Sequence, residues 1–131
     1  MSQPSAYAFP NTYVHLRDDG DATPIAVTES FWPDLAAGKL ELGPGRLVAF
    51  FEFDADWDSW ETHPAGEEVV CLIAGAMDFI LELPEGHQTV ELREPGAFLL
   101  VPRGTWHTAR VHEPSRAMFI TAGEGTEHRP A

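Results

Sequence analysis

Short runs of apolar residues recur along most of the chain, and glycine and proline separate them. The clearest alternation spans 77–83, where every second residue is apolar, as on one face of an extended strand: Met77, Phe79, Leu81 and Leu83. Similar runs predict further strands at 47–53, 57–63, 67–73, 88–93, 97–101, 106–111 and 117–121. Turn sequences rich in proline and glycine lie between several of them, at 84–86, 94–96 and 102–104. This spacing predicts an all-β sandwich or barrel.

Two of these runs, 47–53 and 67–73, are apolar on both faces. A second subunit or the N-terminal segment is therefore expected to cover them. One helix is predicted over 31–37, with Thr28 or Ser30 as its cap and Gly38 as its stop. Its buried stripe would consist of Phe31, Trp32 and Leu35.

The length of 131 residues suits one domain with a single core. We expect an N-terminal extension with the short helix over 1–45, packed on a barrel over 46–121, and a C-terminal tail over 122–131. The tail is polar and rich in glycine, so we expect it to be disordered or loosely docked.

Acidic residues outnumber basic ones by 21 to 8, which gives a formal net charge of −13. Such a chain repels phosphate backbones and anionic membrane surfaces, so neither nucleic acid nor a membrane is an expected partner. No run of residues approaches the length of a membrane span, and residues 1–10 lack the features of a signal peptide. We therefore expect a cytoplasmic protein. The lone cysteine, Cys71, excludes an internal disulfide and is expected to act as a small buried hydrophobe.

Side chains that can bind a metal gather beside two of the predicted turns. Glu61 and His63 are two residues apart, so on a strand they share a face. A turn at 64–66 would bring Glu68 to them from the next strand, and His107 would have to arrive from a distant strand. Glu67 competes with Glu68 for this role, and strand parity does not decide between them.

The first of these stretches resembles motif one of the cupin superfamily, which reads His-x-His, three or four residues, Glu, six residues and Gly. His63, Glu68 and Gly75 match the second histidine, the glutamate and the glycine of that motif. Glu61 stands in place of the first histidine, and Ala55 in place of the leading glycine. The interval to Gly75 favours Glu68 over its neighbour as the motif glutamate.

The second stretch resembles cupin motif two, which reads Gly, five residues, Pro, one residue, Gly, two residues, His, three residues and Asn. Gly96, Pro102, Gly104 and His107 match, and Val111 replaces the asparagine. The two motifs cover roughly residues 46–121. The resemblance implies an all-β fold, a double-stranded β-helix or jelly-roll barrel preceded here by a short helix, and it suggests a homodimer.

In metal-binding cupins, the motif histidines and the glutamate are the ligands. Carried over, the resemblance implies a site made of Glu61, His63, Glu68 and His107. Carboxylate and imidazole ligands suit Fe(II), Mn(II), Ni(II) or Zn(II) without choosing among them. A divalent ion would also relieve the repulsion between the two carboxylates. The protein would then act on a small polar metabolite, as an oxygenase, isomerase or lyase.

Two other functional hypotheses remain. The missing motif histidine would also fit a metal-free cupin enzyme, in which His63 or His107 is the catalytic base. A non-enzymatic module that binds or senses a small molecule is the third hypothesis.

Aromatic residues are candidates for lining the ligand pocket, chiefly Trp57, Phe79 and Phe98. Trp57 shares strand parity with Glu61 and His63 and is the preferred pocket residue, whereas Trp106 should point away from His107. The remaining histidines are expected at the surface, as is Arg103 of the second motif: His15, His87, His112 and His128.

Overall fold

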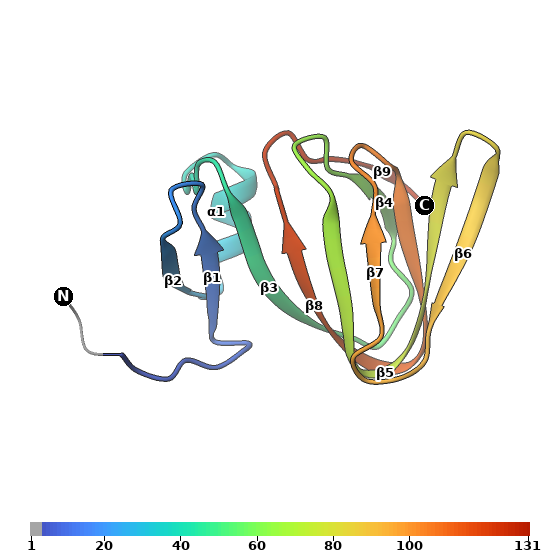
Figure 1. Cartoon of the computed structure of the whole chain (residues 1–131), viewed down its shortest axis with the longest axis horizontal. Helices are drawn as coiled ribbons and strands as arrows, with labels where there is room; N and C mark the ends of the chain where they lie inside the picture. Colours follow the sequence, from blue (N-terminus) through green and yellow to red (C-terminus); the bar gives the residue numbers. More distant parts are fainter. Residues whose placement is uncertain (1–3) are drawn as a thin grey trace.

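The computed structural model describes residues 4–131, which form ten elements in chain order (Figure 1). The single helix, α1, spans Phe31–Ala36. The strands are β1 (Thr12–Leu16), β2 (Ala22–Ala26), β3 (Arg46–Phe53), β4 (Ser59–Thr62), β5 (Glu68–Leu83), β6 (Gly86–Leu92), β7 (Phe98–Val101), β8 (His107–Thr121) and β9 (Glu127–Pro130).

The two long strands, β5 and β8, pair with each other along most of their length and connect the two halves of the fold. Their register shifts between Leu72 and Met77, where both strands bend. Gly75 lies in this bend with a φ of 95°, and a Cβ there would meet Ser115 Oγ at 2.2 Å. Only glycine fits such a close approach of two strands, which explains the glycine of the first motif.

One half of the fold contains the first part of β5 and the last part of β8, in the strand order β2-β1-β3-β8-β5-β7. The other half contains the remaining parts, in the order β9-β4-β8-β5-β6. Apolar side chains of both halves form one buried cluster, which includes Val70 and Phe119 from the first half and Met77, Phe79 and Leu81 from the second. The main core therefore lies between the two halves.

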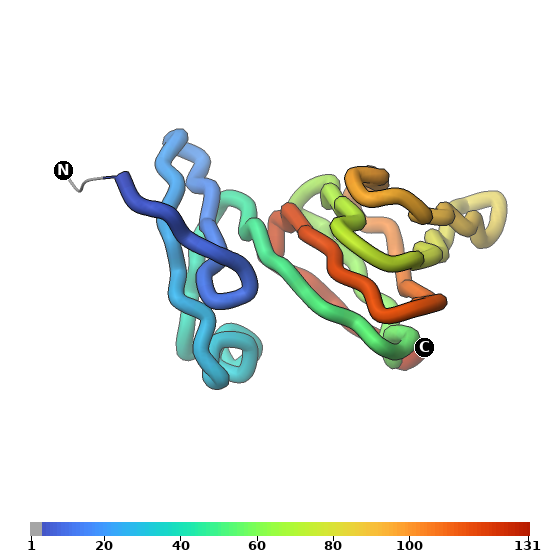
Figure 2. Tube along the Cα trace, turned by 90° about the horizontal axis from the view of Figure 1, so that it is seen from below, coloured from blue at the N-terminus to red at the C-terminus, as the bar shows by residue number. Residues whose placement is uncertain are grey.

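The N-terminal residues extend the first half beyond the core. β1 pairs with both β2 and β3, so residues 12–26 form a hairpin on the edge of the sheet (Figure 2). Helix α1 packs over this hairpin and over β3 through Trp32, whose ring centroid lies 5.4 Å from that of Phe51. Tyr13, Phe31 and their neighbours form a second small core here.

The predicted strands are present, but their number and limits differ. The runs predicted at 67–73 and 77–83 join into β5, and those at 106–111 and 117–121 join into β8, because each strand bends without ending. β1 and β2 were not predicted. The expectation of a loose tail was wrong, since β9 pairs with β4 from Ser59 to Thr62.

The helix lies where it was predicted, and it ends at Ala36. Phe31 is buried in it, whereas Trp32 is 39% exposed. At six residues, it is far too short to cross a membrane, and no other helix occurs within residues 4–131.

Candidate metal centre

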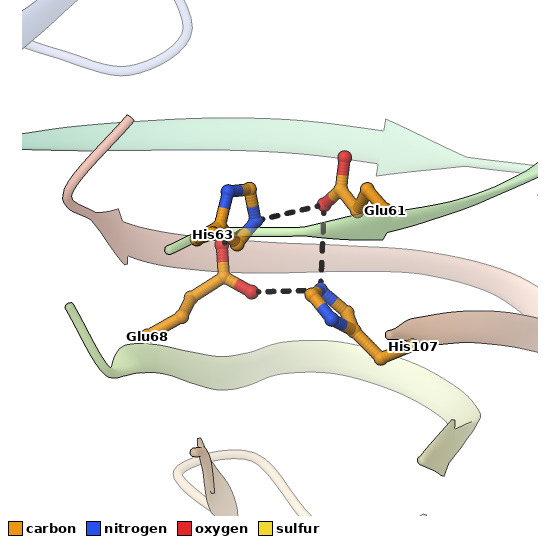
Figure 3. Close-up of side chains that lie close together, drawn as sticks. All are labelled: Glu61, His63, Glu68 and His107. Atoms are coloured by element: carbon orange, nitrogen blue, oxygen red, sulfur yellow. Dashed lines mark ion pairs between the residues drawn. The ribbon is translucent and has the colours of Figure 1, made fainter. Parts of the chain in front are cut away.

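The four candidate ligands come from the ends of three strands and lie together in the structure (Figure 3). Glu61 lies in β4, and His63 follows the end of this strand. Glu68 begins β5, and His107 begins β8. Glu61 pairs directly with His107 in the β4–β8 register, so two residues distant in sequence meet across one ladder. One ligand atom from each residue lies within 4.8 Å of the others.

A backbone hydrogen bond from the turn of the second motif holds the first motif in place. The backbone N–H of Gly104 donates a hydrogen bond to the carbonyl oxygen of His63 at 3.0 Å. Gly104 has a φ of 71°, which a residue with a side chain rarely adopts. The two motifs thus join at their turns, and the join brings His63 and His107 to a ring centroid distance of 5.3 Å.

Three of the four side chains are buried: His63 at 6% exposure, Glu68 at 2% and His107 at 0%. Glu61 is 21% exposed and lies on the open side of the group. Glu67 is exposed, so the burial of Glu68 selects it as the glutamate that faces the two imidazoles.

The Nε2 atoms of the two histidines converge on the two carboxylates. His63 Nε2 lies 3.4 Å from Glu61 Oε1 and 3.2 Å from Glu68 Oε2. His107 Nε2 lies 3.5 Å from Glu61 Oε1 and 3.1 Å from Glu68 Oε1. Neither Nε2 atom makes a well-aligned hydrogen bond with any described residue. These nitrogen and oxygen atoms therefore converge on a common point between the four side chains.

The other ring nitrogen of each histidine has a partner that sets its protonation. His107 Nδ1 lies 3.0 Å from the carbonyl oxygen of Thr105, which can only accept a hydrogen bond, so Nδ1 carries the proton. His63 Nδ1 lies 2.9 Å from Thr126 Oγ1, whose own proton is donated to Gly123 O at 2.8 Å. This hydroxyl oxygen therefore accepts from His63 Nδ1. In the neutral state, both imidazoles direct the lone pair of Nε2 into the site.

Both carboxylates are also held from outside the group. Thr121 Oγ1 donates a hydrogen bond to Glu68 Oε2 at 2.6 Å. Glu61 Oε2 lies 3.3 Å from Nε2 of His128, a residue of β9 that pairs with Glu61 in the strand register. One oxygen of Glu61 therefore lies toward the two histidines of the group, and the other lies toward His128.

The charges of the group shift its ionisation strongly. Burial alone would lower the pKa of both histidines, but the facing carboxylates of Glu61 and Glu68 outweigh it and raise the pKa to about 9 for His63 and about 10 for His107. Burial would raise the pKa of each glutamate, but the two histidines outweigh it and hold the pKa of both well below the usual range. Without another cation, the site is thus a cluster of two ion pairs.

These residues fit a divalent metal ion. The Nε2 atoms of both histidines and Oε1 of Glu68 are buried and lack hydrogen-bond partners among residues 4–131. Imidazole and carboxylate are the ligand types of Fe, Mn, Ni and Zn sites. The hydrogen bonds to both Nδ1 atoms are those that orient histidine ligands in metal sites. The group can therefore hold a divalent cation in place of the protons that it carries alone.

A cavity of about 1150 Å³ adjoins the group and is lined by Glu61, His63, Glu68 and Trp57, among others. Phe79 is fully buried in the core beneath, and its ring contacts that of Trp57 edge to face at a centroid distance of 5.6 Å. Phe98 lies elsewhere, since its side chain is 63% exposed on β7 and does not line the cavity. Of the three aromatic candidates, only Trp57 is placed at the cavity wall.

One of the histidine assignments was wrong. His15 is 2% exposed, not a surface residue, because the loop before β3 covers it: a Cβ on Gly45 would lie 3.2 Å from His15 Nε2. His87, His112 and His128 are exposed, as expected.

Three residues contact the candidate ligands without having been predicted to do so: Thr121, Thr126 and His128. A threonine at a strand end and a polar tail carry no signal that separates them from ordinary surface residues.

The sequence matches no protein-family model, and no curated protein matches it. The structure is similar to hydroquinone 1,2-dioxygenase from Sphingomonas sp. TTNP3, with 17% identity, a TM-score of 0.51 and 60% of each chain covered. A cupin superfamily protein from Desulfitobacterium hafniense matches at 16% identity and a TM-score of 0.52, over 65% of this chain and 72% of that one.

Oxalate decarboxylase from Bacillus subtilis matches at 15% identity and a TM-score of 0.53, over 65% of this chain. The matched part spans only 60% of the length of the dioxygenase and 23% of that of the decarboxylase. Similarity at this level of identity concerns the fold alone. The chain has the fold of the cupin superfamily, as its two motifs implied.

Proposed function

We propose that this protein is a metal-dependent enzyme that acts on a small molecule bound in the cavity beside Glu61, His63, Glu68 and His107. One observation carries the proposal. Both histidines use Nδ1 for hydrogen bonds to Thr126 or to the Thr105 carbonyl, so both direct Nε2 at two carboxylates without a hydrogen bond of their own. This arrangement is typical of histidine ligands to a metal ion.

In this proposal, the two histidines and Glu68 hold the ion, and Glu61 completes the set from the open side. The ion would supply Lewis acidity toward an oxygen atom of the bound molecule. While the metal is bound, the lone pair of each Nε2 is used for it, so His63 or His107 would be the catalytic base only in a metal-free enzyme. Glu61 is the most exposed member and its second oxygen contacts His128, so it would face the bound molecule from the open side of the site.

Similar proteins support a divalent metal. The oxalate decarboxylase has Mn(II) centres, which supports a metal here. The dioxygenase was solved with 4-hydroxybenzoate bound, which supports a small-molecule ligand. We propose Fe, Mn, Ni or Zn for this chain, since its ligand types do not distinguish them. The small molecule would enter from the side where Glu61 and His128 lie.

The proposal is tested by measuring bound metal in protein purified without a metal-affinity step. The unaltered chain and the double variant E61A/H107A are reconstituted with Fe, Mn, Ni or Zn and analysed for metal content. We expect one equivalent of at least one metal in the unaltered chain and none in the double variant. The matched control is H112A, which removes an exposed histidine outside the cavity and should keep the metal.

Circular dichroism of each sample separates metal loss from unfolding. Less than stoichiometric metal in the folded, unaltered chain after all four reconstitutions would refute the metal centre. A metal-loaded protein that binds members of a metabolite pool but consumes none of them would instead indicate a binding or sensing module.

We further propose how the chain is organised and assembled. Residues 1–45 form an extension that covers the cavity, residues 46–121 form the cupin unit, and residues 122–131 complete the site through Thr126 and His128. The two halves of the fold would close as a double-stranded β-helix. A second copy of the chain would cover the apolar outer face of β5 and β7, which exposes Ile73, Phe98 and Leu100.

A further inference from the structure

The cavity beside the candidate ligands continues to a buried histidine at some distance from them. His15 of β1 lines this cavity and is 2% exposed. Its Nδ1 is buried and has no hydrogen-bond partner within the described part of the chain. Almost all buried polar side-chain atoms in native proteins have a partner. The proposed metal centre does not use this imidazole. A molecule bound in the cavity could supply the hydrogen-bond partner that the protein lacks at this position.

The strand register places His15 relative to the metal centre. His15 pairs with Leu47 of β3, and Leu47 pairs with Thr121 of β8, so these side chains share one face of the sheet. Neighbouring strands are about 4.8 Å apart, which puts the backbones of His15 and Thr121 about 10 Å apart. Thr121 donates its hydrogen bond to Glu68. A molecule that reaches from the centre to His15 therefore has a body about as long as two aromatic rings.

The wall between the two ends is apolar and rich in aromatic rings. The inward residues of β3 after Leu47 are Ala49, Phe51 and Phe53, and all of them line the cavity. The ring of Phe51 lies 5.4 Å from that of Trp32 in α1 and 5.4 Å from that of Phe119 in β8. Such a wall favours an apolar, preferably aromatic, body.

The charges around the cavity limit which chemical groups the two ends of this molecule can carry. Besides Glu61 and Glu68, four further carboxylates line the cavity and make it unfavourable for an anion: Glu41, Asp56, Asp58 and Glu124. Burial, with a smaller contribution from Arg17, lowers the pKa of His15, so its imidazole is neutral and offers both a donor and an acceptor nitrogen. A hydroxyl group, which also donates and accepts, matches a neutral imidazole in either tautomer.

We infer that His15 forms a distal subsite for a hydroxyl group, and that the substrate is an uncharged, elongated molecule with an aromatic body and a hydroxyl group near each end. This inference rests on the proposed function, in which an oxygen atom of the substrate lies at the metal centre; we infer that this oxygen is the second hydroxyl. His15 is thus a specificity residue, and it takes no part in the chemistry at the ion.

The test compares two rigid probes, 4,4′-biphenol and 4-phenylphenol, which differ by one terminal hydroxyl. Their dissociation constants are measured by calorimetry on the metal-loaded chain and on the variants H15L and H15Q. The unaltered chain should prefer the biphenol by about tenfold, the effect of one well-placed hydrogen bond. H15L should lose this preference, and H15Q, which retains hydrogen-bonding atoms, should recover part of it.

Three results would overturn the inference: equal affinity of the unaltered chain for both probes, an unchanged preference in H15L, or no binding of either probe to the metal-loaded chain. Metal content, measured on the same samples, keeps the two proposals apart. Stoichiometric metal without binding of either probe refutes the inferred substrate class and leaves the proposed metal centre standing. A chain that takes up no metal refutes the proposed function. The His15 subsite is then tested without metal, by comparing the affinity of 4-phenylphenol for the unaltered chain with its affinity for H15L.

Discussion

At the scale of single residues, the candidate centre depends on side chains that lie behind the four candidate ligands. Thr126 accepts a hydrogen bond from His63 Nδ1 because its own proton is donated to Gly123 O. This chain of two hydrogen bonds leaves the lone pair of His63 Nε2 directed at the carboxylates. Partners of this kind typically change metal affinity by 10- to 100-fold when they are removed.

We therefore expect the variant T126V to bind metal about 10- to 100-fold more weakly, since valine keeps the shape but not the hydroxyl. T126S keeps the hydroxyl and should bind metal as the unaltered chain does. Competition with a chelator of known affinity measures both. Equal affinities for T126V and T126S would contradict the assigned tautomer of His63.

The raised histidine pKa values lead to an expectation for stability against pH. In the metal-free chain, the pKa of His63 rises to about 9 and that of His107 to about 10, from the usual histidine value of 6.5. A raised pKa in the folded state stabilises the fold fully below the unfolded pKa, and this stabilisation is lost as the pH rises through the folded pKa. The Tm of chelator-treated protein should fall between pH 6.5 and about pH 10.

Metal binding reverses this dependence, because the ion must displace the two ring protons and therefore binds better as the pH rises. The difference in Tm between metal-loaded and chelator-treated protein should widen across the same interval. Thermal scans at several pH values measure this difference, in which the titration of all other groups cancels. A difference that stays constant with pH would argue against a site that contains both histidines.

At the scale of elements, the sequence predicted most strands and the four side chains that the structure brings together, and it failed where the local pattern carries little information. Alternation marks 77–83 clearly because one face of that strand is core. β9 shows no such alternation, and it pairs with β4 through the backbone. Its Arg129 lies over the rings of Trp60 and Trp106 and pairs with Glu82. These are contacts between distant segments, and no local rule predicts them.

The motif spacing succeeded for a different reason. Glu68 and His107 begin strands directly after turns, so their positions follow from the turn geometry that proline and glycine specify. His15 was misjudged because a lone histidine in a short run does not reveal that the loop at Gly45 covers it. Its burial is set by the packing of an element on its neighbour.

The bend of β5 provides an expectation at this scale. G75A should lower the free energy of unfolding by more than about 2 kcal/mol, because a positive φ costs an alanine about 1–2 kcal/mol and the new Cβ also overlaps Ser115. G96A is the matched control, since Gly96 has a similar φ of 91° but a Cβ there would meet no other described residue within 4 Å beyond its chain neighbours. Denaturant unfolding of both variants separates the cost of the positive φ from the cost of the overlap with Ser115. An equal loss of unfolding free energy in G75A and G96A would mean that the close approach of β5 and β8 does not constrain this position.

At the scale of the whole molecule, the outer face of the first half is unusually apolar for a chain with a net charge of −13. Two rows of residues cross four strands in register, from β7 through β5 and β8 to β3. One row contains Leu100, Val69, Ile120 and Val48, and the other contains Phe98, Cys71, Met118 and Phe50. None of these eight residues is charged, and none is fully buried. A continuous apolar surface of this kind typically marks a protein interface.

The proposed homodimer would bury these rows against the same rows of a second copy, since an interface with two-fold symmetry uses one patch on both subunits. The N-terminal segment already covers one end of the patch, because Phe9 stacks on Phe50 at a centroid distance of 5.3 Å, and the uncovered end lies at Phe98 and Leu100. The double variant F98E/L100E should therefore be monomeric, because it would place four like charges in a small interface.

Sedimentation equilibrium measures the mass of the unaltered chain and of this variant. The matched control is H87E/Q88E, which adds the same charge to the exposed β6 and should remain a dimer. Because the cavity lies on the opposite face of the sheet, the monomeric variant should keep its metal and its affinity for 4,4′-biphenol. An unaltered chain that is monomeric at all concentrations would contradict the proposed dimer, and a monomeric variant without metal would mean that the outer face supports the site as well as the assembly.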